Sequence, residues 1–144
     1  MKSFEDFMKE GVVKKVSINR ERARNMVVES ERRMRSLDEH LKKIGIRDEN
    51  ANDYVEYCYD IIMHLLRAKM YLDGYSSSGQ GAHEAEVSYM KMIRFSEKDV
   101  RFADQIRYFR NGILYYGTTL DREYAHKVID FAKKVYQNMK GMLI

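Results

Sequence analysis

Apolar residues recur every three or four positions along most of the chain, which is the spacing of one face of an α-helix. After a short segment around residues 4–8, this spacing predicts five helices. They cover about residues 17–44, from Asn50 or Asn52 to residue 73, and residues 83–94, 96–116 and 121–142. The joints between them are short, so neighbouring helices are expected to reverse direction. The pattern predicts an all-α fold, an antiparallel up-and-down bundle of four to five helices.

The helix predicted to end at residue 73 is apolar on nearly all sides. Only Glu56, Asp60 and Arg67 form a narrow polar strip along it. A helix of this kind is expected at the centre of the bundle, because it has little surface to offer to water. Cys58 lies within its apolar part and is interpreted as packing.

Residues 74–82, GYSSSGQGA, form the clearest predicted loop. Glycines before a helix start suggest a phosphate cradle, since they leave backbone N–H groups accessible. The segment contains no lysine and does not follow the pattern of a phosphate-binding loop, and no strand is predicted before it. A plain flexible connection is the favoured interpretation.

Length and composition limit the classes of protein that fit. With 144 residues the chain is expected to form one domain, in which residues 1–16 are a short N-terminal extension. Proline is absent and there is a single cysteine, which excludes an internal disulfide and a Cys-rich zinc site. No apolar run approaches the roughly 20 residues that span a bilayer. The expectation is a cytoplasmic protein without a membrane segment, bound metal or cofactor.

The net charge of +4 is concentrated in one segment. Residues 14–43 hold ten Lys or Arg and five acidic residues, and the rest of the chain is nearly neutral. Such a balance permits a nucleic-acid partner but does not require one. Because Glu31 and Asp38 lie among the basic residues, a solvated face with salt bridges is the favoured interpretation.

Arg110 interrupts the apolar seam of the fourth predicted helix. The seam consists of Ala103, Ile106, Ile113 and Leu114, and Arg110 falls at its centre. An always-charged guanidinium in such a place is costly unless it is paired. Two explanations stay open: an ion pair or a position at the bundle end, or a cleft in which the arginine binds a phosphate.

The residues from Arg110 to Gly117 (RNGILYYG) resemble the Arg-Asn signature of the HEPN superfamily. Two further features fit the same order, Gly74-Tyr75 after the buried helix and His83-Glu84-Ala85 at the start of a short one. The resemblance extends from about residue 17 to the C-terminus. It implies a helical bundle associated with nucleotides and RNA, a homodimer formed through the fourth helix, and a small nucleotidyltransferase as partner, in some systems of toxin–antitoxin type.

HEPN ribonucleases carry a histidine four to six residues after the arginine, and here the fifth and sixth positions are Tyr115 and Tyr116. A phenol is a much poorer proton shuttle at neutral pH than an imidazole. The resemblance therefore favours a non-catalytic nucleotide- or RNA-binding module with Arg107, Arg110, Asn111 and Tyr115 as binding residues. One alternative is a metal-independent endoribonuclease using Arg110, Asn111 and Tyr115, Tyr116 or a distant histidine. Another is a helical dimerisation scaffold.

The four histidines are candidates for that base. His64 is interpreted as a core-edge residue satisfied by Asp60, and His83 as a cap or surface residue at a helix start. His40 and His126 fall on polar faces and are expected to be solvated. No pair has the spacing and carboxylate of a helical metal site.

Overall fold

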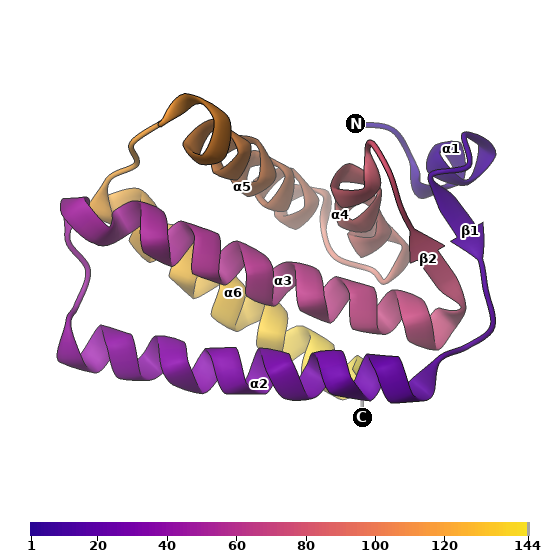
Figure 1. Cartoon of the computed structure of the whole chain (residues 1–144), viewed down its shortest axis with the longest axis horizontal. Helices are drawn as coiled ribbons and strands as arrows, with labels where there is room; N and C mark the ends of the chain where they lie inside the picture. The colour runs from indigo at the N-terminus through magenta and orange to yellow at the C-terminus, as the bar shows by residue number, and fades with distance from the viewer. Residues whose placement is uncertain (144) are drawn as a thin grey trace.

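In the computed structural model, residues 1–143 are described and form six α-helices and a two-stranded sheet (Figure 1). The prediction of an all-α fold is confirmed. Element boundaries differ little from those predicted, and the largest difference is the start of α2 at Arg20. The elements are α1 (Phe4–Lys9), β1 (Val13–Lys15), α2 (Arg20–Lys43), the 3₁₀ helix η1 (Asp48–Asn50), α3 (Ala51–Asp73), β2 (Tyr75–Ser77), α4 (Ala82–Met92), α5 (Glu97–Tyr116) and α6 (Arg122–Leu143).

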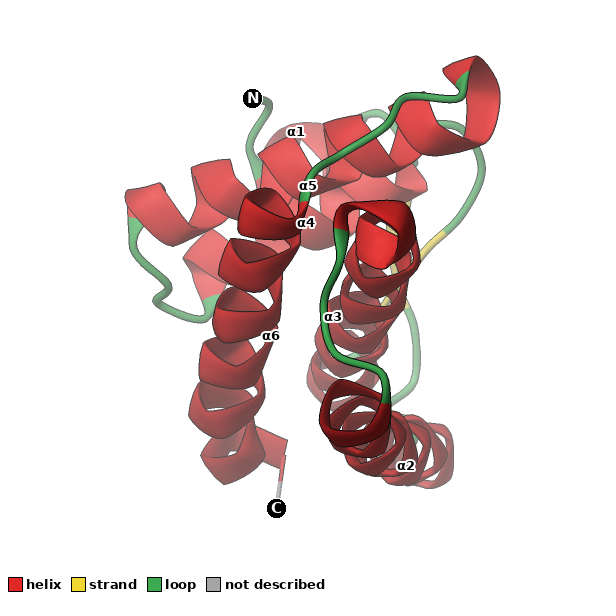
Figure 2. Ribbon diagram, turned by 90° about the vertical axis from the view of Figure 1, so that its left-hand side faces the viewer, coloured by secondary structure: helices red, strands yellow, loops and turns green. Residues whose placement is uncertain are grey.

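The long helices form a bundle around α3. Figure 1 shows that α2, α3, α5 and α6 alternate in direction, and Figure 2 shows α6 to the left of α3, α2 below it, and α4 and α5 toward the top. The centre of the core comes from the apolar side chains of α3, which are almost without contact with water: Val55, Cys58, Ile61, Ile62, Met63, Leu65 and Leu66. The predicted central position of this helix is therefore confirmed.

Side chains and glycines at the helix ends explain where the helices begin and end. The Asn19 side chain accepts a hydrogen bond from the backbone of Arg22 at the start of α2, and Ser96 does the same for Asp99 in α5. Each bond satisfies an N–H that has no partner inside the helix. Gly74 ends α3 in the left-handed conformation (φ 84°), which glycine adopts without the steric cost of a Cβ.

The small sheet was not predicted. β1 and β2 pair antiparallel, with Val13 opposite Ser77 and Lys15 opposite Tyr75, so part of the glycine- and serine-rich segment is a strand rather than a plain loop. Each strand has three residues, too few for an alternating pattern to be recognised. Phe4 and Phe7 of α1 are buried beside the sheet and α4, in a second apolar cluster.

The joint between α5 and α6 is held by the first turn of α3. The Asn52 amide donates a hydrogen bond to the carbonyl of Thr118 (2.8 Å), and its oxygen accepts one from the backbone of Leu120 (2.9 Å). These bonds hold the C-terminal end of α5 against α3, and so set the position from which Arg110 approaches α3. Within residues 1–143, no helix is long and apolar enough to cross a membrane.

Candidate functional site

Arg110 projects from α5 onto α3 at the edge of the core. Its side chain is 23% exposed, and its guanidinium lies 5.2 Å from the centre of the Tyr59 ring. The nearest carboxylate is that of Asp60, with 4.0 Å between Nη2 and Oδ1. The buried Nε has no hydrogen-bond partner among the residues described. The arginine is thus largely removed from water, yet it lacks a carboxylate at hydrogen-bonding distance.

Asp60 is shared between two arginines. Arg33 of α2 approaches its other carboxylate oxygen to 3.6 Å, while also donating a hydrogen bond to Glu29 at 3.1 Å. Charge-assisted hydrogen bonds between arginine and carboxylate are about 2.7–2.9 Å long. Both contacts of Asp60 are longer, so this carboxylate compensates the charge of Arg110 only in part.

The other buried or half-buried arginines near Arg110 have closer partners. Arg67 donates to both carboxylate oxygens of Glu86, at 2.5 and 3.2 Å, and the Glu86 side chain is only 3% exposed. Arg107 donates to Asp104 of its own helix at 2.8 Å. Arg110 therefore differs from these two neighbours in lacking a carboxylate at hydrogen-bonding distance.

Arg110, Asp60 and Tyr59 form a cluster at the edge of the core, and His83 contacts it through Tyr59. Its Nδ1 lies 3.3 Å from the Tyr59 hydroxyl, across the interface between α3 and α4. Burial raises the pKa of Tyr59 above its ordinary value, so the phenol stays protonated. Its hydroxyl donates to Nδ1 in one imidazole tautomer and accepts from the Nδ1–H in the other. Burial, opposed in part by Glu86, lowers the pKa of His83, which keeps the imidazole neutral at neutral pH.

The residues that the sequence placed at the site are only partly brought together. Arg107 and Asn111 are half-buried on α5, whereas Tyr115 and Tyr116 are 75% and 86% exposed near its C-terminal end. Five and six residues along a helix correspond to rotations of about 140° and 240° from Arg110. Both phenols therefore lie on other sides of α5 than Arg110, and their role stays a prediction.

Tyr59 and His83 are the residues that the sequence analysis did not place in the cluster. They are separated by 24 positions and meet only through the packing of α4 on α3. The position of His83 at the start of a predicted helix indicates a capping or surface role. The structure has Gly81 at the N-cap of α4, and His83 is exposed, as a surface role requires, while its ring contacts Tyr59. Helical spacing within one element carries no signal for such a contact.

The remaining histidines and the cysteine agree with their structural interpretation. His64 is satisfied by Asp60, although Nδ1 contacts the backbone carbonyl (2.8 Å) rather than the carboxylate. His126 is exposed and lies 3.6 Å from Asp130. Burial raises the pKa of the Cys58 thiol to about 12, which keeps it protonated and unreactive.

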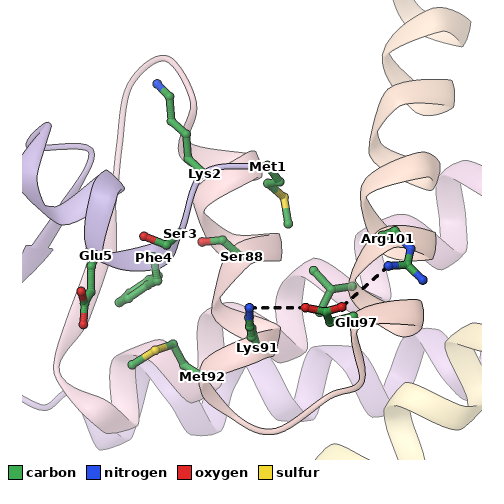
Figure 3. Close-up of a pocket in the computed structure, with 11 residues that line it drawn as sticks. Met1, Lys2, Ser3, Phe4, Glu5, Ser88, Lys91, Met92, Glu97 and Arg101 are labelled. Atoms are coloured by element: carbon green, nitrogen blue, oxygen red, sulfur yellow. Dashed lines mark ion pairs between the residues drawn. The ribbon is translucent and has the colours of Figure 1, made fainter.

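A separate hollow of about 440 Å³ lies where the N-terminal residues meet α4 and α5 (Figure 3). Phe4, Met92 and Val100 contribute apolar surface, and Glu97 forms ion pairs at its rim with Lys91 (3.6 Å) and Arg101 (3.9 Å). None of the residues around Arg110 lines it. We therefore place the candidate site at Arg110 and not in this hollow.

The cluster around Arg110 offers cationic and hydrogen-bonding groups, not metal ligands. No group of three His, Cys, Asp or Glu side chains suited to a metal ion occurs in the part of the chain that the structure describes. The groups available in the cluster are the guanidinium of Arg110, the hydroxyl of Tyr59 and the imidazole of His83. Comparisons of the chain with protein-family models, curated proteins and solved structures find no match.

Proposed function

We propose that this protein is a HEPN-like, non-catalytic module that binds a phosphate group of RNA or of a nucleotide through Arg110. The observation that carries the proposal is the incomplete pairing of Arg110, whose nearest carboxylate oxygen is 4.0 Å away. A phosphate would supply the missing acceptors, since its oxygens match the planar guanidinium in charge and geometry. Asn111, which follows Arg110 in α5, is proposed as a further donor, because its amide can donate to a phosphate oxygen.

Dimerisation and partnership form the second part of the proposal. The resemblance of the segment from Arg110 to Gly117 to HEPN proteins implies a homodimer formed through α5, and a small nucleotidyltransferase partner in the cytoplasm, in some systems of toxin–antitoxin type. Exposed apolar side chains gather along this helix and support its role as an interface: Tyr108, Leu114, Tyr115 and Tyr116. An apolar group at the surface is stabilised when a second chain covers it.

The expected effect of Arg110→Ala is a loss of at least tenfold in affinity for a fluorescein-labelled single-stranded oligouridine, measured by fluorescence anisotropy. The loss follows from removing charge-assisted hydrogen bonds to a phosphate. Arg101→Ala is the matched control, because Arg101 lies on the same helix with its side chain 74% exposed. Equal affinities of both variants and the wild type would contradict the proposal. A dimer that binds no RNA or nucleotide would favour the scaffold alternative.

A metal-independent endoribonuclease is the second candidate, and the contact between His83 and Tyr59 favours it. In the tautomer whose Nδ1–H donates to the Tyr59 oxygen, Nε2 of the neutral imidazole can accept the proton of a ribose 2′-hydroxyl, whose oxygen then attacks the adjacent phosphorus. The bond from phosphorus to the 5′-oxygen breaks, that oxygen takes a proton from water, and Arg110 stabilises the charge that develops on the phosphate. In this mechanism His83 acts as the base, in place of the histidine that HEPN ribonucleases carry near the position of Tyr115.

Cleavage of single-stranded RNA in the presence of EDTA tests this second candidate. An active wild type should lose at least a hundredfold in rate on His83→Ala, in keeping with the usual contribution of a general base. His126→Ala, which changes an exposed histidine, should cleave as the wild type does. Binding without cleavage by the wild type would exclude the ribonuclease and leave the binding module.

A further inference from the structure

A second hollow, of about 230 Å³, lies where the N-terminal end of α2 meets the C-terminal end of α3 and β2, at the right-hand end of the molecule in Figure 1. It is smaller than the 300–1,000 Å³ typical of pockets that enclose a whole drug-sized ligand. A phosphate group fits such a space. The polar side chains that line it are two arginines and two serines, which can donate to phosphate, and one carboxylate: Arg22, Arg67, Ser76, Ser77 and Glu86.

Arg22 is the residue of this hollow with an uncompensated charge. Its guanidinium lies 4.7 Å from the centre of the Tyr71 ring, which holds it over the C-terminal part of α3. Within residues 1–143 it makes no ion pair, whereas Arg32 and Arg33 further along the same helix both contact Glu29. Stacking on an aromatic ring leaves the edge of the guanidinium free to donate to an anion.

The acidic residue of the hollow is already neutralised. Glu86 is buried, and both of its carboxylate oxygens accept hydrogen bonds from Arg67. The pair contributes no net charge, so Arg22 sets the sign of the potential in the hollow. Ser76 and Ser77 of β2 add hydroxyl groups that can donate to phosphate oxygens.

The hollow continues the surface on which Arg110 lies. Asp60, Arg67 and Tyr71 fall within one narrow arc of α3, because seven and eleven residues are close to two and three whole helical turns. At one end of this arc Asp60 contacts Arg110, and at the other end Tyr71 contacts Arg22. The rise of a helix puts Asp60 and Tyr71 about 16 Å apart along its axis. That separation exceeds a single nucleotide and suits an extended strand.

We propose that the hollow at Arg22 is a second phosphate subsite, which binds another phosphate of the same RNA strand whose first phosphate lies at Arg110. This inference rests on the proposed function and specifies that a single-stranded oligonucleotide, which reaches both sites, binds more tightly than a mononucleotide, which binds at Arg110. Arg22 and the serine hydroxyls hold the second phosphate, and the face of α3 between the two sites carries the intervening nucleotides.

The test compares Arg22→Ala with Arg24→Ala, which removes the same charge two positions away on another side of α2. Binding is measured by fluorescence anisotropy with labelled oligouridine at several salt concentrations, and by calorimetry with uridine monophosphate. We expect Arg22→Ala to weaken oligouridine binding about tenfold. It should also reduce the slope of log affinity against log salt by about 0.7, the value for one phosphate contact on a single strand.

The mononucleotide separates this inference from the proposed function. Arg22→Ala should bind uridine monophosphate as the wild type does, whereas Arg110→Ala should lose both ligands. If Arg110→Ala alone weakens oligouridine binding, or if Arg22→Ala and Arg24→Ala weaken it equally, the second subsite is wrong while the proposed function stands. If the wild type binds neither ligand, both fail together.

Discussion

Replacing Glu86 with alanine is expected to lower the free energy of unfolding by about 3–5 kcal/mol, because it leaves the charge of Arg67 without its partner at the α3–α4 interface. The Glu86 side chain is 3% exposed, and Arg67 contacts both of its oxygens. Removing one member of a buried pair sacrifices the attraction and retains the cost of desolvating the other. The measurement is urea-induced unfolding followed by circular dichroism.

Two controls separate this effect from a general loss of negative charge. Glu39→Ala breaks a pair with Lys43 in which both side chains are largely exposed, and should change stability by less than about 1 kcal/mol. The double replacement Arg67→Met with Glu86→Leu removes both charges and should recover much of the stability lost by Glu86→Ala. A loss for Glu86→Ala no greater than that for Glu39→Ala would contradict the assignment of this pair as buried and coupled.

Replacing Leu66 with alanine is expected to cost about 2–5 kcal/mol, through the lost apolar transfer energy and the cavity left behind. Leu66 is fully buried at the centre of α3, where the helices of the bundle meet. Leu114→Ala makes the same chemical change on α5 at a side chain that is 49% exposed, and should cost far less. Equal losses in unfolding experiments on the two variants would contradict the central position of α3.

The helices were predictable because each carries its signal within its own residues. Apolar spacing identified α2, α3, α5 and α6. The sheet was missed for the opposite reason. β1 and β2 gain their stability from pairing across some sixty residues of sequence, and three-residue strands leave no periodic pattern.

The candidate site was predictable only at its central residue. Arg110 was recognised because a permanent charge at the centre of an apolar seam contradicts the pattern around it. Its surroundings depend on tertiary packing: Tyr59 belongs to α3, and His83 reaches it from α4. The sequence had instead selected Tyr115 and Tyr116, which are near Arg110 in the chain but on other sides of α5.

Nuclear magnetic resonance of the Arg110 guanidinium during titration with uridine monophosphate tests the central claim most directly. The guanidinium signals are assigned by their loss in Arg110→Lys. If Arg110 binds phosphate, its signals should shift progressively and saturate, with the same dissociation constant as calorimetry gives for the nucleotide. Nucleotide binding that leaves the Arg110 signals unchanged, or the absence of binding, would show that Arg110 is instead a structural partner of Asp60 and Tyr59.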